Sequence, residues 1–378
     1  MEVENIELIC LKGKFGDKKN YFGYKKYKSS TIIKITLKNK IIGVGETLAG
    51  VYSPKIVSII FDFIKKNLKK KITLKYLSDG LNKFKKNKFL FNEGIFVSVI
   101  AGIECAIFDI YNQIGKDNKF LNYTNLTQRK KVEVYASCGS ILSTPKEILN
   151  DINNANRRNF NKVKIRINLQ DKNLFTKIKI AQENIENYAI DLICNTFDQK
   201  ANFKKMNLFL EKLSIYKKKP LWIEEFLFID DLFIFNRFKK KFNFSYGENF
   251  NSLFSLFTLL DKFKFKYINP DISHLPISEF IKLNNYIDKT YDEKKILIHS
   301  WGGPINIYLS LILASIFNKS IYLVEYPTTY FSINKKLNDI IEIKNSKIDV
   351  NSLPINRGYD LISNLKNFKN ISNFSFKF

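Results

Sequence analysis

The chain has 378 residues, 45% of them hydrophobic, so it can bury a large core and is too apolar for a disordered protein. Its formal net charge of +26 suggests a nucleic-acid or membrane-surface protein. Only six of the 62 basic residues are arginine, however, and the many lysines, like the abundant Asn, Ile, Phe and Tyr, are encoded by AT-rich codons, so we expect neither partner.

Residues 1–125 are expected to form an α+β unit. Two segments, 6–13 and 31–47, alternate between apolar and polar residues like strands of an antiparallel meander, with a hairpin turn at 38–40. The pattern then becomes helical, most clearly over 95–115, where apolar residues recur at helical spacing.

Residues 126–345 alternate between short apolar runs and longer amphipathic stretches. The runs are VEVYAS, KVKIRI, AIDLIC, LWIEE, FSYGEN, KYINPD, ILIHS and IYLVEYP, and seven of the eight precede a helix-like segment. Eight strands that alternate with helices predict a barrel of parallel strands. The final residues, 346–378, are polar and are interpreted as irregular.

The cysteines and the apolar segments indicate the compartment. The four cysteines are widely separated and form no C-x-x-C pair, which argues against a disulfide framework and a zinc site. The acidic N-terminal segment lacks the layout of a signal peptide, and the longest apolar stretch is too short to span a bilayer. These features predict a soluble, cytoplasmic protein.

Polar side chains stand at the ends of seven of the predicted strands. They are Lys164 with Arg166, Asn195, Glu224, Glu248, Asp271, His299 and Glu325. Because a barrel brings the carboxyl ends of its strands to one rim, we expect these side chains to form an active site.

Three of these side chains predict a metal site, and two predict an acid–base pair. Asn195, Glu224 and Glu248 are oxygen donors, which favour Mg²⁺ over zinc. Asp271 is placed to hydrogen-bond the far nitrogen of His299 and raise its basicity. The other histidine, His274, is interpreted as a rim residue at most.

Several short motifs occur in an order and spacing that resemble a known family. They are GVGET (43–47), GIECAIFDIYNQIGK (102–116), VYAS (134–137), VKIR (163–166), WIEE (222–225), GEN (247–249), PD (270–271), HSWG (299–302) and VEYP (324–327). The chain resembles the mandelate racemase-like members of the enolase superfamily, which include the acid-sugar dehydratases. The resemblance implies a modified (β/α)₇β TIM-type barrel, an α+β N-terminal capping domain completed by the C-terminal tail, and a homo-oligomer.

The resemblance also implies Mg²⁺ and the abstraction of a proton next to a carboxylate. Glu224 and Glu248 match the second and third metal ligands of the family, and Asn195 stands where the first is normally aspartate. Lys164 matches the first lysine of a Lys-x-Lys pair, which neutralises the substrate carboxylate. Arg166 replaces the second lysine and, because guanidinium stays protonated, is a poor base.

The resemblance makes His299 the base, with Asp271 as its partner, and makes Glu325 the acid that hydrogen-bonds the other side of the carboxylate. Since only His299 is suited to act as a base, we expect a dehydratase of a sugar acid, in which a β-hydroxyl leaves as water. A racemase or epimerase of the same superfamily and a non-catalytic binding protein with a decayed site are the alternatives. The cap-loop tyrosines are candidates for substrate contact: Tyr21, Tyr24 and Tyr52.

Overall fold

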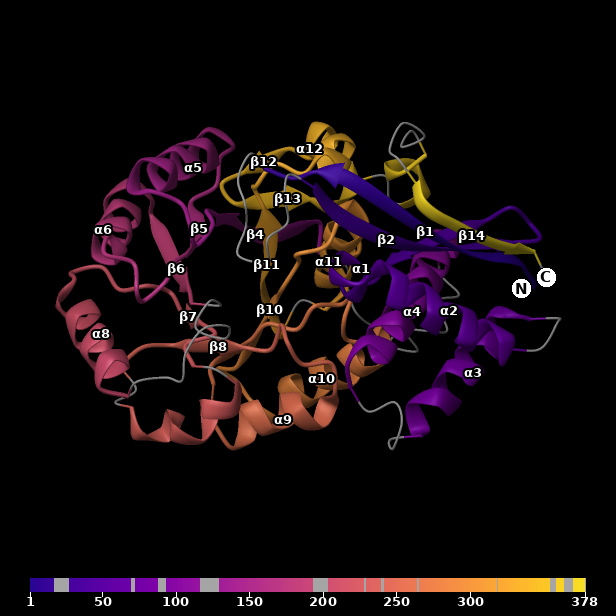
Figure 1. Cartoon of the computed structure of the whole chain (residues 1–378), viewed down its shortest axis with the longest axis horizontal. Coiled ribbons are helices and arrows are strands. Elements are labelled where there is room, and N and C mark those ends of the chain that lie inside the picture. The colour runs from indigo at the N-terminus through magenta and orange to yellow at the C-terminus, as the bar shows by residue number, and fades with distance from the viewer. Residues whose placement is uncertain are drawn as a thin grey trace.

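The computed structural model describes most of the chain. The described residues are 1–16, 27–68, 72–87, 93–115, 129–192, 203–227, 229–238, 241–263, 265–317, 319–353, 358–363 and 370–377. Tyr21, Tyr24 and Asn195 lie outside them. Figure 1 shows two parts side by side, a ring of strands surrounded by helices and a smaller part that contains both ends of the chain.

The smaller part is the cap, and it is built on an antiparallel sheet. In chain order its strands are β1 (Val3–Lys14), β2 (Tyr27–Leu37), β3 (Ile42–Glu46) and β14 (Asn370–Lys377). The predicted turn at 38–40 joins β2 to β3. The prediction of an irregular tail is wrong for β14, which pairs with β1 and has the strand-like alternation of NFSFK (373–377).

In the described part of the cap, four helices accompany the sheet. They are α1 (Ala49–Tyr52), α2 (Pro54–Lys66), α3 (Leu74–Lys86) and α4 (Ile95–Ile114). Helix α4 packs against β3 at Gly45, where an added Cβ would lie 2.0 Å from the carbonyl oxygen of Gly102. Among the described helices, α4 alone has the length and apolarity of a membrane span, but 78% of its most apolar window is buried inside the protein. It is therefore the core helix of the cap.

The larger part is a parallel barrel. Its strands are β4 (Lys131–Cys138), β5 (Lys162–Arg166), β6 (Asn187–Asp191), β7 (Ile223–Glu224), β8 (Phe244–Tyr246), β9 (Tyr267–Ile268), β10 (Lys295–Ile298) and β11 (Ile321–Pro327). Pairing of β11 with β4, for example Val324 with Val134, closes the ring. The predicted barrel of eight parallel strands is thus confirmed in the described part of the chain.

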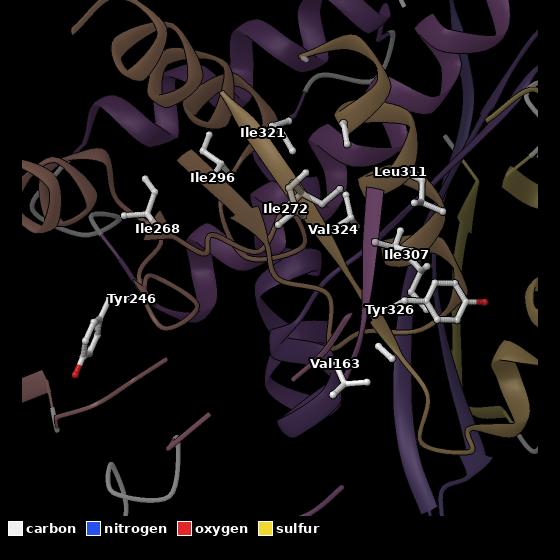
Figure 2. Close-up of a cluster of buried hydrophobic side chains, with 14 of the residues drawn as sticks. Val163, Tyr246, Ile268, Ile272, Ile296, Ile307, Leu311, Ile321, Val324 and Tyr326 are labelled. Atoms are coloured by element: carbon white, nitrogen blue, oxygen red, sulfur yellow. The ribbon is translucent and has the colours of Figure 1, made fainter. Parts of the chain in front are cut away.

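Helices cover the outside of the barrel (Figure 1). They are α5 (Pro145–Arg157), α6 (Leu174–Asn184), α8 (Phe203–Ile215), the 3₁₀-helix η2 (Ile229–Arg237), α9 (Leu253–Asp261), α10 (Ile277–Thr290) and α11 (Pro304–Ile316). The chain then continues through η3 (Ser332–Asn334), α12 (Lys335–Ile340), β12 (Ile343–Lys344), β13 (Lys347–Asp349), η4 (Val350–Ser352) and η5 (Gly358–Leu361). Apolar side chains between helices and strands form the main core, and Figure 2 shows part of it, including Ile307 of α11 and Tyr326 of β11.

A smaller apolar cluster fills the inside of the barrel. Its fully or largely buried members are Tyr135, Ala189, Trp222, Tyr267, Leu297 and Leu323. Successive strand residues point to opposite faces, so the next inward side chain lies two positions further along each strand. That position holds Asp191, Glu224, His299 and Glu325 on four of these strands. The apolar cluster is therefore the floor of a polar site.

Buried polar contacts join the cap to the barrel. The Lys85 ammonium of α3 lies 2.5 Å from Oε1 of Glu104 on α4. Glu104 Oε2 accepts a hydrogen bond of 2.9 Å from the backbone N–H of Ser278 on α10. Because both charged side chains are almost fully buried, this pair fixes how the cap sits on the barrel.

Candidate active site

All the described strand-end side chains that the sequence predicts lie in one network of charge contacts. Lys164 Nζ lies 2.5 Å from Glu224 Oε1 and 3.2 Å from Glu325 Oε1. The Arg166 guanidinium lies 3.3 Å from Glu325 Oε1. The other oxygen of Glu325, Oε2, lies 3.6 Å from His299 Nε2. The barrel thus brings these distant residues to one place.

The network contains one carboxylate that the sequence analysis misses. Strand β6 ends at Asp191, whereas the run AIDLIC suggests an end at Cys194 followed by Asn195. Asp191 Oδ2 lies 3.4 Å from Lys164 Nζ and 3.3 Å from Arg166 Nε. Asp191 is also in register with Glu224 of the next strand. Its position two residues after the inward-facing Ala189 is the sequence signal that identifies it.

Lys164 is a permanently charged group in this arrangement. Burial alone would lower its pKa, but the neighbouring carboxylates of Glu224 and Glu325 outweigh burial and hold the pKa well above its usual value. The guanidinium of Arg166 stacks on the ring of Trp301, with 4.4 Å between its central carbon and the ring centroid. Both cations therefore suit the binding of an anion.

A histidine–aspartate pair faces these cations. His299 Nδ1 lies 2.8 Å from Asp271 Oδ2, so Nδ1 donates and Nε2 points to Glu248, 3.1 Å away. Burial would raise the pKa of Asp271, but the hydrogen bonds from His299 and Ser273 outweigh it and keep the pKa low. Asp271 thus fixes the tautomer of His299.

The pKa of His299 is raised to about 10, because the carboxylates of Glu248, Glu325 and Asp271 outweigh the opposing effect of burial. Burial raises the pKa of Glu248 to about 7, against the attraction of His299. His299 therefore carries a proton while it faces Glu248, and it can serve as a base once Glu248 is engaged elsewhere.

The site has a surplus of negative charge that fits a divalent cation. Its carboxylates are Asp191, Glu224, Glu248, Asp271 and Glu325, and its cations are Lys164, Arg166 and protonated His299. With all five carboxyl groups ionised, negative charge would exceed positive charge by two in a buried place. Burial raises the pKa of Glu224 and of Glu248, as expected where that excess has no counter-ion. As they lie, no three described His, Cys, Asp or Glu side chains converge on a common metal position, since each carboxylate is turned toward a cation.

A cavity of about 380 Å³ opens at this network. Arg166, Glu248 and His299 form its charged end. His274 also lines it, which agrees with the interpretation as a rim residue, and burial lowers the pKa of His274 to about 4, which leaves the ring neutral. Tyr52, the described candidate among the cap tyrosines, lines the cavity too.

The cap contacts the loop that follows His299. Glu46 of β3 accepts hydrogen bonds from the backbone N–H groups of Gly303, at 2.6 Å, and Asn306, at 3.1 Å. The side-chain amide of Asn306 in turn donates to both oxygens of Asp271, each at 3.2 Å. Asn306 thus links the cap to the histidine–aspartate pair, a role that no sequence pattern indicates.

Comparison with known proteins gives structural neighbours only. No protein-family model matches the chain, and no curated protein matches it. A crystal structure of a member of the enolase superfamily from Agrobacterium tumefaciens is similar, with a TM-score of 0.74 and 14% identity over 93% of this chain and 95% of that one. An enolase from the Sargasso Sea environmental genome gives a TM-score of 0.72 and 19% identity over 98% of both chains.

A third neighbour is the 3,6-anhydro-D-galactonate cycloisomerase from Zobellia galactanivorans. Its TM-score is 0.72 and its identity 18%, over 93% of this chain and 94% of that one. These likenesses confirm the predicted fold class, a TIM-type barrel with an N-terminal capping domain whose sheet is antiparallel.

Proposed function

We propose that this chain is an enzyme that removes the proton α to a carboxylate, with His299 as the base and a bound Mg²⁺. The observation that carries the proposal is the meeting of the His299–Asp271 pair with Lys164 and Arg166 in one buried network of carboxyl groups, from which Arg166, Glu248 and His299 reach the cavity. The shared fold of solved enolase-superfamily proteins supports it.

Asp191, Glu224 and Glu248 would hold the metal ion. They come from consecutive strands, all three are buried, and carboxylate oxygens are the ligands that Mg²⁺ prefers. When bound there, Mg²⁺ would stabilise the negative charge that develops on the substrate carboxylate. Asp191 takes the place that the resemblance gives to Asn195 and restores the negative charge that an amide lacks.

Lys164 and Arg166 bind and orient the substrate carboxylate. Glu325 lies between these cations and His299. Burial would raise the pKa of Glu325, but the attraction of Lys164 and His299 outweighs burial and lowers the pKa. It therefore accepts hydrogen bonds and positions its neighbours.

The reaction that these groups favour is elimination of water from a hydroxy acid. A racemase needs a second base on the opposite face of the α-carbon, and the raised pKa of Lys164 makes it a poor base. In the elimination, the α-carbon loses its proton to His299 Nε2, the bond to the β-hydroxyl breaks, and the hydroxyl leaves as water with a proton from His299. The resulting enol becomes a 2-keto-3-deoxy acid. A sugar acid is one substrate of this kind.

The test is a screen of 2,3-dihydroxy acids, sugar acids among them, for keto-acid formation with MgCl₂ and after treatment with EDTA. We expect metal-dependent formation of a keto acid from at least one compound. Keto-acid formation that survives both EDTA and His299→Asn would refute the proposed function.

A further inference from the structure

We infer that the substrate carries an apolar group beyond its two oxygenated carbons, so that an aliphatic or aromatic 2,3-dihydroxy acid fits this site better than a polyhydroxylated sugar acid. The inference rests on the proposed function and concerns the part of the cavity that faces away from the charged network.

Most of the cavity wall beyond its charged end is apolar. The apolar side chains that line it are Phe15, Leu48, Ala49, Ile95, Ile141 and Trp301. The first four belong to the cap, and the last two belong to loops that follow barrel strands. The wall therefore forms where the two parts of the protein meet, in the same cavity as Arg166, Glu248 and His299.

Aromatic packing holds one side of this wall in place. The ring of Phe15 packs edge-on against Trp301, with 5.6 Å between centroids, and against Phe331, at 5.9 Å. Trp301 is in turn stacked on Arg166. This packing holds the rings of Phe15 and Trp301 in place at the cavity.

Among the described residues of the wall, the remaining polar side chains are those of Tyr52, Ser53, Ser140, Asn249, His274 and Thr329. Some of them already have partners within the protein. Ser140 Oγ accepts a hydrogen bond from the backbone N–H of Leu142 at 3.2 Å, and His274 Nδ1 lies 3.4 Å from the amide nitrogen of Asn251. The hydroxyls of a sugar acid would compete for these groups.

The energies of burial favour the apolar tail. A hydroxyl buried without a hydrogen-bond partner weakens binding, whereas a buried methylene strengthens it. Replacing one hydroxyl-bearing tail carbon by a methylene should therefore improve affinity by about tenfold or more.

The cavity has room for a tail. Its volume of about 380 Å³ is in the range of small-molecule sites. A branched aliphatic chain or a single ring can therefore extend from the two hydroxyl-bearing carbons.

The experiment compares 2,3-dihydroxy-5-methylhexanoate and 2,3-dihydroxy-3-phenylpropanoate with D-gluconate and D-galactonate, using the full chain and MgCl₂. We measure the dissociation constant of each compound by titration calorimetry and keto-acid formation by proton NMR. The inference predicts at least tenfold tighter binding of the apolar acids, and equal or tighter binding of the sugar acids would overturn it. Keto-acid formation from none of the four would count against the proposed function, while the binding order would still decide the inference.

Two substitutions on one loop give a matched control. Ile141 is 8% exposed and lines the cavity, whereas Leu142 is 56% exposed and is not among the lining residues. Ile141→Asn should reduce the preference for the apolar acids at least tenfold, and Leu142→Asn should leave it unchanged. Ala49→Ser adds a hydroxyl to the same wall with little volume and should shift the preference the same way if Ile141→Asn does not fold. An unchanged preference in folded variants of the wall would contradict the inference.

Discussion

Replacement of Asp191 by asparagine tests the metal site most sharply, because the sequence and the structure point to different first ligands. Asp191 is 1% exposed, so solvent does not screen its charge. Asp191→Asn removes one of the carboxyl groups proposed to hold the cation and should weaken Mg²⁺ binding. Asn195→Ala, at the position that the resemblance indicates, should leave Mg²⁺ binding close to that of the wild type.

The size of the effect follows from linkage. At a Mg²⁺ concentration 100 times the dissociation constant, a cation that binds only the native state stabilises it by about 2.7 kcal/mol. Loss of a group that supports a metal site weakens affinity about 10–100-fold, and a direct ligand belongs at the upper end of that range. At the same concentration, a 100-fold weaker variant gains only about 0.4 kcal/mol.

The assay is urea unfolding of wild type, Asp191→Asn and Asn195→Ala, with and without MgCl₂. Without metal, Asp191→Asn should fold normally, because Lys164 and Arg166 retain Glu325 as a partner. Full Mg²⁺ stabilisation in Asp191→Asn together with its loss in Asn195→Ala would refute the assignment of Asp191.

Three further predictions concern the groups that hold the site and the cap. Asn306→Ala removes two hydrogen bonds to Asp271 and should lower kcat about tenfold with little change in KM, as steady-state kinetics would measure. Lys85→Met and Glu104→Gln should each cost about 3–5 kcal/mol in urea unfolding, and the double variant less than their sum, because each single change leaves a buried charge unpaired. Burial outweighs the attraction of Glu46 and lowers the pKa of Lys28 from 10.5 to about 7, so between these values the unfolded chain binds more protons than the native one. Stability should therefore rise with pH in that window, and Lys28→Met should flatten the rise.

Each of these three predictions has an outcome that contradicts it. For Asn306→Ala, it is an unchanged kcat, or a loss confined to KM. For Lys85 and Glu104, additive unfolding energies would mean that the two side chains do not interact. For Lys28, the contradicting outcome is a pH dependence of stability that is the same in the wild type and in Lys28→Met. The expected homo-oligomer stays a prediction, which light scattering on the purified chain would test.

The sequence carries enough information to predict the barrel and much of the charged network. Side chains alternate between the two faces of a strand, so Lys164 and Arg166 point to the same, inner face. Glu224 and His299 point to that face too, because they follow the inward-facing Trp222 and Leu297 by two positions. Asp191 also follows an inward-facing residue by two positions. The sequence does not single it out, because apolar residues continue after it and make the strand seem longer than it is.

Other features depend on contacts that no local pattern records. Asn306 reaches Asp271 only because the first turn of α11 lies beside the loop after β9. The apolar wall combines cap residues such as Phe15 with barrel-loop residues such as Ile141, and its character appears only when the two parts are assembled. His274 lines the same cavity, and nothing in its flanking sequence indicates this.

The most direct test of the central claim is deuterium exchange at the α-carbon. The protein is incubated in D₂O with MgCl₂ and a 2,3-dihydroxy acid, and the α-proton signal is followed by NMR for the wild type and for His299→Asn. Loss of the α-proton, by exchange or through elimination, should occur with the wild type and fall by at least two orders of magnitude with folded His299→Asn, in keeping with the usual contribution of a general base. Equal loss of the α-proton with both proteins would show that His299 is not the base.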